Sequence, residues 1–378
     1  MSPDLIRGYS NTVEAPPTVG VEEEFLLVDP RTGAAVGRNV DVARTAADFG
    51  IDLQLEFSRC QVETSTRVHS TTDGLLRELR ELRRGAAMCA EKNNALLLAV
   101  GIPPTVSEDL PVTSTPRYRR IAEDFGMLAH EPGLCGCHVH VAVPDREVAL
   151  QVSNFLRPWL PLYLALTANS AIYRGIETGY ASWRSVLWRR WPSAGPPPHF
   201  SSVLEYDAAV EMMLSLGVIL DRKMVYWDVR PSATFPTVEI RISDVPATVE
   251  ESALLATLVR ATVMTARRDL EAGRQAPAVA DDVLRAAYWK AARFGIDGES
   301  VNPVDGKLIP ARDLLGMLLD HIAPALEQLG DRGFVDESVA ALMVHGNGAR
   351  RQLNAFRERG EIGDVVEELA EATLRSYR

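Results

Sequence analysis

Three segments of the sequence place two polar side chains at alternating positions, and their residue types are those that bind cations or anions. The pairs are Glu22 and Glu24 in TVGVEEEFLLVDP, His138 and His140 in CHVHVAV, and Glu239 and Arg241 in TVEIRISD. Side chains alternate between the two faces of a β-strand, so each pair shares a face opposite its apolar neighbours. Adjacent carboxylates raise each other's pKa, and a bound Mg²⁺ or Mn²⁺ removes that cost. The pairs therefore predict a cation site.

Each pair also has an explanation without function. Amphipathic antiparallel strands often carry a polar, solvated face, which would account for the glutamates. A histidine pair can be structural, and Glu239 with Arg241 can form a surface ion pair. Three such pairs in one chain favour the functional interpretation.

The elements that would position these pairs are strands and one well-marked helix. Apolar or alternating segments predict strands over 18–28, 53–66, 95–104, 137–143, 223–232 and 237–246. Thr71, Thr72 and Asp73 are candidate caps of a helix with leucines at helical spacing. Residues 147–170 and the chain after Thr248 are predicted to be helical, and 174–200 to form a long functional loop.

Clustered helices and strands without regular β-α-β alternation predict an α+β fold with an antiparallel sheet. We expect a flexible N-terminal arm over 1–17 and a single catalytic domain over 18–378. That domain would be sheet-rich over 18–245 and mainly helical over 248–378.

Composition narrows the class of protein. The 378 residues carry a net charge of −11, which argues against broad nucleic-acid binding. No signal peptide or membrane-length apolar run is present in the sequence, so we expect a soluble cytoplasmic protein without a membrane partner. Cys135 and Cys137 beside the histidines could suggest zinc, but a second cysteine pair is missing. We interpret the four cysteines as packing residues, without disulfides.

Four motifs in order carry a family resemblance. TVGVEEEFLLVD, CGCHVHVAVPD, NSAIYRGIETGYASWR and WDVRPSATFPTVEIRISD resemble the type 2 glutamate–cysteine ligases, or carboxylate–amine ligases. That family looks like a branch of the glutamine synthetase superfamily. The resemblance implies a glutamine synthetase-like curved antiparallel β-sheet with helices packed on its outer face. It also implies a homodimer, and a concave face that holds ATP, an acid substrate and two or three Mg²⁺ or Mn²⁺ ions.

The resemblance also implies roles for particular residues. One cation would be held by Glu24, Glu56 and Glu63, and the other by Glu22, His138 and Glu239. Arg241 and Arg230 would hold the transferred phosphoryl group, whose charge suits the guanidinium fork. The substrate pocket would include Arg174, Thr178, Tyr180, Ser182 and Arg184. His140 would touch nucleotide or substrate, or instead hydrogen-bond a metal ligand.

The function implied is an ATP-dependent carboxylate–amine ligase. Glutamate would be activated as an acyl phosphate and then joined to an amine, with cysteine the acceptor in the family's name. Two alternatives stay open from the residues alone. One is a metal-dependent amide hydrolase, which would need no nucleotide. The other is a catalytically silent, metal-binding homo-oligomer.

Overall fold

The computed structural model describes residues 15–106, 112–130 and 133–375, so the predicted N-terminal arm lies mostly outside the described residues. A seven-stranded antiparallel sheet runs through its centre in the order β2-β3-β1-β5-β9-β8, with β4 paired to the end of β1. Two short hairpins, β6-β7 and β10-β11, lie apart from it. The strands are β1 (Val19–Val28), β2 (Leu53–Leu55), β3 (Gln61–Ser65), β4 (Leu96–Leu98), β5 (Gly136–Ala142), β6 (Ile172–Tyr173), β7 (Ile176–Glu177), β8 (Val229–Pro231), β9 (Thr237–Asp244), β10 (Glu299–Val301) and β11 (Leu308–Pro310).

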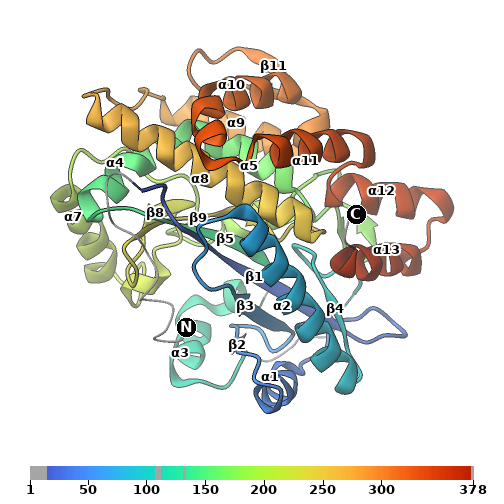
Figure 1. Ribbon diagram of the computed structural model, residues 1–378. Coiled ribbons are helices and arrows are strands. Elements are labelled where there is room, and N and C mark those ends of the chain that lie inside the picture. Colours follow the sequence, from blue (N-terminus) through green and yellow to red (C-terminus); the bar gives the residue numbers. More distant parts are fainter. Residues whose placement is uncertain (1–14, 107–111, 131–132, 376–378) are drawn as a thin grey trace.

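Helices cover the sheet mainly from one side, where α8, α9, α10 and α11 gather (Figure 1). The α-helices are α1 (Asn39–Asp48), α2 (Thr72–Lys92), α3 (Pro116–Phe125), α4 (Arg146–Leu156), α5 (Leu160–Thr167), α6 (Trp183–Trp188), α7 (Val203–Ser215), α8 (Val249–Glu271), α9 (Asp281–Phe294), α10 (Ala311–Leu329), α11 (Arg332–His345), α12 (Gly348–Arg359) and α13 (Ile362–Leu374). Short 3₁₀ helices are η2 (Gly126–His130), η3 (Arg157–Trp159), η4 (Arg222–Met224) and η5 (Gly295–Asp297).

The predicted elements are largely present, with three local differences. The helical region over 147–170 is divided into α4, η3 and α5, because Pro158 and Pro161 cannot donate backbone hydrogen bonds within a helix. The predicted loop over 174–200 contains β7 and α6. The hairpin of β10 and β11 interrupts the helical C-terminal region. All four cysteines are buried and free, as predicted.

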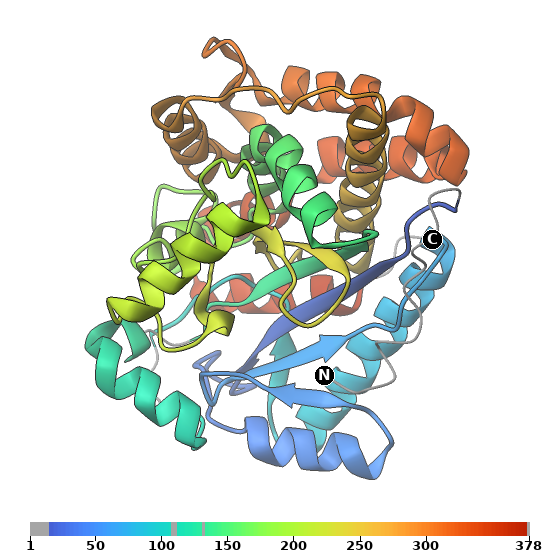
Figure 2. The same cartoon turned by 90° about the vertical axis from the view of Figure 1, so that its left-hand side faces the viewer.

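Alternation along the strands divides the sheet into two chemically different faces. Val139 and Val141 of β5, together with Val238 and Ile240 of β9, belong to the main apolar core that includes α4, α5 and α8. The polar partners in the same strands lie on the opposite face. In Figure 2, α2 lies to one side of β1 and β3, while α3 and α7 lie to the other.

Glu23 is the exception on the apolar side of β1, and it is neutralised by a buried arginine. Arg83 of α2 donates to both carboxylate oxygens of Glu23, at 2.6 and 3.1 Å. Its remaining hydrogen bonds go to the carbonyl groups of Pro246, Ala247 and Thr373 and to the Ser252 hydroxyl. The side chains of Arg83 and Glu23 are only 1% and 0% exposed. This pair therefore joins β1 to α2, to the start of α8 and to the end of α13.

No helix in the described part of the chain combines the length and apolar character needed to cross a membrane.

We expect Arg83→Met to lower the free energy of unfolding by about 3–5 kcal/mol, because it leaves the Glu23 carboxylate buried without a partner. Chemical denaturation of the purified chain measures the change. The exposed neighbour provides a matched control, and Arg84→Met should stay within about 0.5 kcal/mol of the parent. A loss below about 1 kcal/mol for Arg83→Met would show that the pair does not hold the elements together.

Candidate active site

A cavity of about 270 Å³ lies on the polar face of the sheet. Its walls come from β1, β3, β5, β8 and β9 on the sheet side, and from α3, α6 and the segments 223–226 and 232–235 around them. The ionisable residues that line it are Glu22, Glu24, Glu56, Glu63, Arg117, His138, His140, Lys223, Arg230, Glu239 and Arg241. The cavity thus collects all the predicted metal and phosphoryl ligands, and His140 as well.

Strand register explains how residues so distant in sequence meet. Glu63 of β3 lies opposite Glu24 of β1, and Glu22 lies opposite His138 of β5. His140 then lies opposite Glu239 of β9, which also faces Arg230 of β8. Side chains directly opposite one another on one face have neighbouring Cβ atoms. The register therefore produces one diagonal row of polar groups across five strands.

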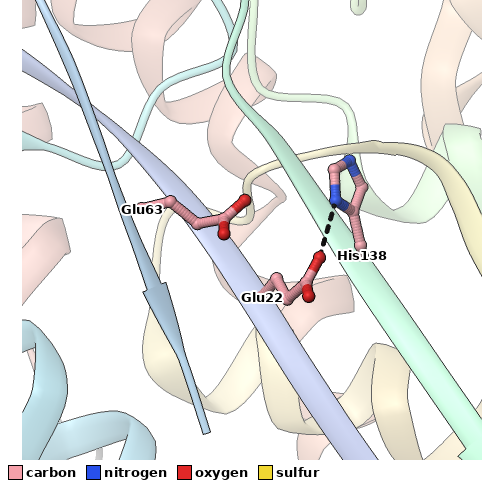
Figure 3. A group of neighbouring side chains, drawn as sticks. All are labelled: Glu22, Glu63 and His138. Atoms are coloured by element: carbon pink, nitrogen blue, oxygen red, sulfur yellow. Dashed lines mark hydrogen bonds and ion pairs between the residues drawn. The ribbon is translucent and has the colours of Figure 1, made fainter. Parts of the chain in front are cut away.

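Two groups within this row have the donors and spacing of a cation site. Glu22, Glu63 and His138 each offer a ligand atom within 4.8 Å of the others. Figure 3 shows these three side chains gathered between their strands. Glu24, Glu56 and Glu63 form a second group of the same kind. Two oxygens bound to one Mg²⁺ at about 2.1 Å lie at most about 4.2 Å apart, so small side-chain movements would suffice. Glu63 is common to both groups, which would place the two cations side by side.

The acidic end of the cavity is only partly balanced, because the charge of Arg241 lowers the pKa values of Glu56 and Glu63 by less than burial and the neighbouring glutamates raise them. No lysine or arginine among the described residues forms an ion pair with Glu56 or Glu63. Burial and then the charge of Glu24 raise the pKa of Glu56 to about 8. Burial, followed by repulsion from Glu22 and Glu56, raises the pKa of Glu63 well above its usual range. A divalent cation would remove this repulsion, so the residues present fit Mg²⁺ or Mn²⁺.

The opposite end is balanced by two arginines. Arg230 makes a forked contact with the Glu239 carboxylate, at 2.9 and 3.1 Å, and Arg241 also donates to it. Burial would raise the pKa of Glu239, but the charges of Arg230 and Arg241 outweigh it and lower the pKa well below its usual range. The structure therefore places Glu239 with the arginines and outside both cation groups. Its predicted role as a metal ligand stays a prediction.

The two histidines differ in their surroundings. Burial and then the charge of Arg241 lower the pKa of His138, which favours the neutral imidazole that binds metal ions. Burial alone would lower the pKa of His140, but the nearby Glu22 carboxylate outweighs it and raises the pKa. His140 Nδ1 lies 3.1 Å from the Thr237 hydroxyl, and its Nε2 lies 3.6 Å from Glu22. His140 Nε2 is therefore within ion-pair distance of the candidate ligand Glu22, without an aligned hydrogen bond to it, and the ring lines the cavity.

An aromatic wall faces the carboxylates, and sequence reasoning did not find it. It consists of Phe57, Tyr118, Trp188, Trp191 and Tyr226. The rings pack on one another, with 4.9 Å between the centroids of Trp188 and Tyr226. Such a wall suits a flat or apolar part of a ligand beside the charged end. The only sequence signal was the aromatic content of 174–200, where two of the five residues lie.

The five loop residues predicted to bind substrate do not line this cavity. Thr178 donates to the Ala171 carbonyl group, and the Tyr180 ring packs on Trp183. Arg174 lies over the Tyr173 ring in the turn between β6 and β7. The contacts of Thr178, Tyr180 and Arg174 named here are with other parts of the protein. Their role in binding substrate therefore stays a prediction.

Ser182 and Arg184 join the loop to the end of β9. Ser182 caps α6 and donates to Asp244, and Arg184 Nη1 lies 3.8 Å from the same carboxylate. Arg184 is only 2% exposed, and its Nη2 lies 2.3 Å from where a Cβ on Gly136 would be. A side chain at position 136 would therefore displace the Arg184 guanidinium group from its observed position. Arg184 reaches the cavity only indirectly, through its contact with the Trp188 ring.

The family model of glutamate–cysteine ligase family 2 matches residues 18–368. The chain belongs to this family. A Nocardia farcinica protein named "Putative glutamate--cysteine ligase 2-1" is 68% identical over 95% of this chain and 94% of its own length. A Mycobacterium sp. (strain KMS) protein named "Putative glutamate--cysteine ligase 2-2" is 59% identical over 95% of this chain and 99% of its own.

A solved structure confirms the predicted fold class. The crystal structure of a glutamate–cysteine ligase from Francisella tularensis in complex with AMP matches with a TM-score of 0.70. The match covers 97% of this chain and 91% of that one at 13% sequence identity, so it shows a shared fold. Membership of glutamate–cysteine ligase family 2 and the α+β fold with an antiparallel sheet are thus both confirmed.

Without divalent cations, Glu56→Gln should melt at a higher temperature than the parent above neutral pH. The folded-state pKa of Glu56, about 8, exceeds the value of about 4.3 for an exposed glutamate. The parent therefore loses stability as pH rises from about 5 through about 8, whereas glutamine has no proton to lose. Melting curves in EDTA at several pH values should show a gap of several degrees that grows with pH.

Added Mg²⁺ should reverse the order, because only the parent retains the complete carboxylate set. The exposed Glu91→Gln variant is the control and should follow the parent throughout. Parallel pH profiles for Glu56→Gln and the parent would contradict the electrostatic account of the acidic end.

Proposed function

We propose that this chain is an ATP-dependent carboxylate–amine ligase that joins the carboxyl group of an acid, glutamate by the family's name, to an amine. The observation that carries the proposal is the diagonal row, in which only partly balanced carboxylates at one end meet paired arginines at the other. Carboxylates without basic partners suit cations that accompany a triphosphate, and guanidinium groups suit the phosphoryl group itself. The names of the relatives and the AMP bound to the Francisella tularensis ligase support the proposal.

The chemistry divides between the two ends of the cavity. Bound Mg²⁺ or Mn²⁺ would neutralise the phosphate oxygens and the glutamates around them. Arg241 and Arg230 are proposed to hold the γ-phosphoryl group as the substrate carboxylate attacks its phosphorus atom and ADP leaves. The buried Nε of Arg241 has no hydrogen-bond acceptor among the described residues, so a donor is available there. The resulting acyl phosphate would then be attacked by the amine, which forms the amide and releases phosphate.

The aromatic wall would exclude water from the acyl phosphate and position the adenine ring or the acceptor amine. Exclusion of water matters here, because hydrolysis of the acyl phosphate would consume ATP without forming an amide. A cytoplasmic location and a homodimer remain predictions.

Turnover of ATP separates this proposal from the alternatives. The protein is incubated with ATP, Mg²⁺ or Mn²⁺, glutamate and a panel of amines, including cysteine, while phosphate release is followed. We expect release that depends on both the acid and an amine. Amide cleavage in the absence of ATP would indicate a hydrolase instead, and no turnover with any pair would indicate a catalytically silent protein.

Two substitutions test the proposed roles. Glu24→Gln should remove a cation ligand, and Glu239→Gln should release both arginines, so each should lower phosphate release by about 100-fold or more. Folding is checked by circular dichroism, and Glu91→Gln serves as the surface control. Near-normal turnover in either variant would contradict the role proposed for that residue.

A further inference from the structure

A second cavity, of about 310 Å³, lies on the other side of the sheet from the candidate active site. Its walls come from α2, the first turn of α8, α11 and the start of α12. The two cavities have no lining residue in common. Volumes near 300 Å³ and above are typical of small-molecule sites. The chemistry of its walls indicates which kind of molecule would fit.

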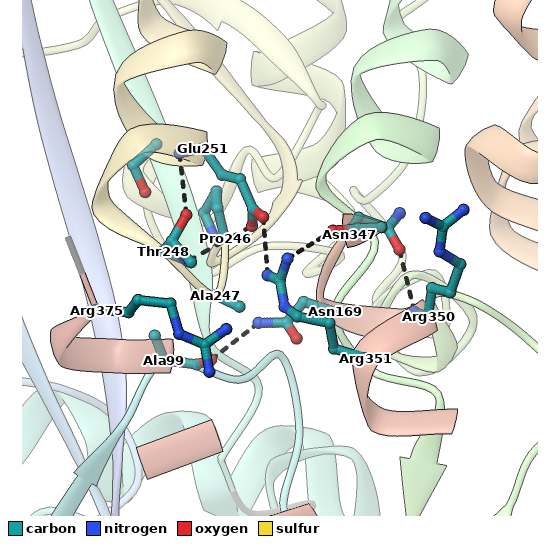
Figure 4. Close-up of polar contacts among 12 residues, drawn as sticks. Ala99, Asn169, Pro246, Ala247, Thr248, Glu251, Asn347, Arg350, Arg351 and Arg375 are labelled. Atoms are coloured by element: carbon teal, nitrogen blue, oxygen red, sulfur yellow. Dashed lines mark hydrogen bonds and ion pairs between the residues drawn. The ribbon is translucent and has the colours of Figure 1, made fainter. Parts of the chain in front are cut away.

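One buried guanidinium group in this cavity has unused donors. Arg351 is held by the Gly346 carbonyl group and lies 2.8 Å from Glu251, a contact that Figure 4 shows. Glu251 is itself fixed by the capping box with Thr248 at the start of α8. The Arg351 side chain is only 8% exposed. Nη2 is the atom that lies near Glu251, and Nε lies 3.7 Å from a carboxylate oxygen of Glu368, but neither N–H group has an aligned hydrogen-bond acceptor among the described residues.

A second guanidinium group lies in the same cavity with the same property. Arg80 of α2 donates from Nη2 to Glu250, at 2.8 Å. Its buried Nε has no acceptor in the described part of the chain. Buried N–H groups without acceptors are rare and costly. Two such groups in one cavity point to an anionic group, such as a carboxylate, as the missing partner.

The remaining walls restrict the ligand further. Glu337 joins Glu250 and Glu251, so three carboxylates accompany the two arginines, and a simple anion would be repelled. An ammonium group on the ligand would balance them. The rest of the lining is mainly apolar, with Leu76, Leu254, Phe334 and Leu342 as its large side chains and Ser338, Ala341 and Gly346 as its small residues.

We propose that this cavity binds an α-amino acid with an apolar side chain. Its carboxylate would accept hydrogen bonds from Arg80 and Arg351, and its ammonium group would lie by the glutamates. Its side chain would pack on the leucines and Phe334. The site is distinct from the cavity proposed for catalysis, and binding there needs neither ATP nor a metal ion.

L-leucine is the probe, titrated into the full-length protein without nucleotide or metal and followed by calorimetry and saturation-transfer NMR. Two analogues of similar shape each remove one charge: 4-methylpentanoic acid lacks the ammonium group, and 3-methylbutylamine lacks the carboxylate. We expect leucine to bind with 1:1 stoichiometry and both analogues to bind at least about tenfold more weakly. No leucine binding at about 10 mM, or equal binding of either analogue, would overturn the proposal.

A matched pair of variants places the binding site. Ala341 lines the cavity, so Ala341→Leu should fill part of it and weaken leucine binding by at least about tenfold. Its exposed neighbour is the control, and Ala340→Leu should bind as the parent does. Should Ala341→Leu fail to fold, Arg80→Gln is compared with the exposed Arg77→Gln in the same way. Leucine binding that survives these changes but is lost in Glu24→Gln would place it in the active cavity and overturn the proposal.

Discussion

The site depends on a strand that carries charge on both of its faces. β1 presents Glu22 and Glu24 to the cavity and Glu23 to the interior, where Arg83 holds it. A one-residue slip in register would exchange the two faces, placing two carboxylates in the apolar core and one in the cavity. The bidentate contact of Arg83 with Glu23, and its bonds to the carbonyl groups of Pro246 and Ala247, oppose such a slip. The inner ion pair is thus a positional constraint on the outer carboxylates.

Charge in the cavity is balanced by two different means. At one end, Arg230 and Arg241 surround Glu239, so its carboxylate is neutralised within the protein. At the other end, burial and the charges of nearby glutamates raise the pKa values of Glu56 and Glu63. Folding tolerates that cost only if something supplies positive charge, and protons or metal ions are the available sources. This asymmetry of charge makes the two ends of the cavity different: the carboxylate-rich end suits cations, and the end with the arginines suits a phosphoryl group.

Much of this site could be predicted from alternation, because a strand's own sequence determines which side chains share a face. Glu22 with Glu24 and His138 with His140 are examples. Register between strands could not be predicted, since it depends on pairings between segments far apart in the chain. Glu63 therefore joins Glu22 and His138, where Glu239 was expected. Glu239 contacts Arg230 of the preceding strand instead, because the register of this short hairpin places the two residues opposite each other, and alternation within either strand does not specify that register.

The loop over 174–200 shows a second limit. Its arginines and hydroxyl-bearing residues are of types that are common in substrate pockets. Ser182 and Arg184 nevertheless contact Asp244 in the interior. A polar residue type does not reveal whether its partner is a ligand or a buried carboxylate. The aromatic wall was missed because Trp188 and Tyr226 are residue types that are also common in an apolar core, although here they line the cavity.

The most direct measurement is anomalous diffraction from crystals grown with Mn²⁺ and a non-hydrolysable ATP analogue. We expect two adjacent manganese peaks, one bonded to Glu24, Glu56 and Glu63 and the other to Glu22, Glu63 and His138. Arg230 and Arg241 should lie on the side of the γ-phosphate. Manganese bound elsewhere, or a triphosphate in this cavity without any metal at these carboxylates, would contradict it.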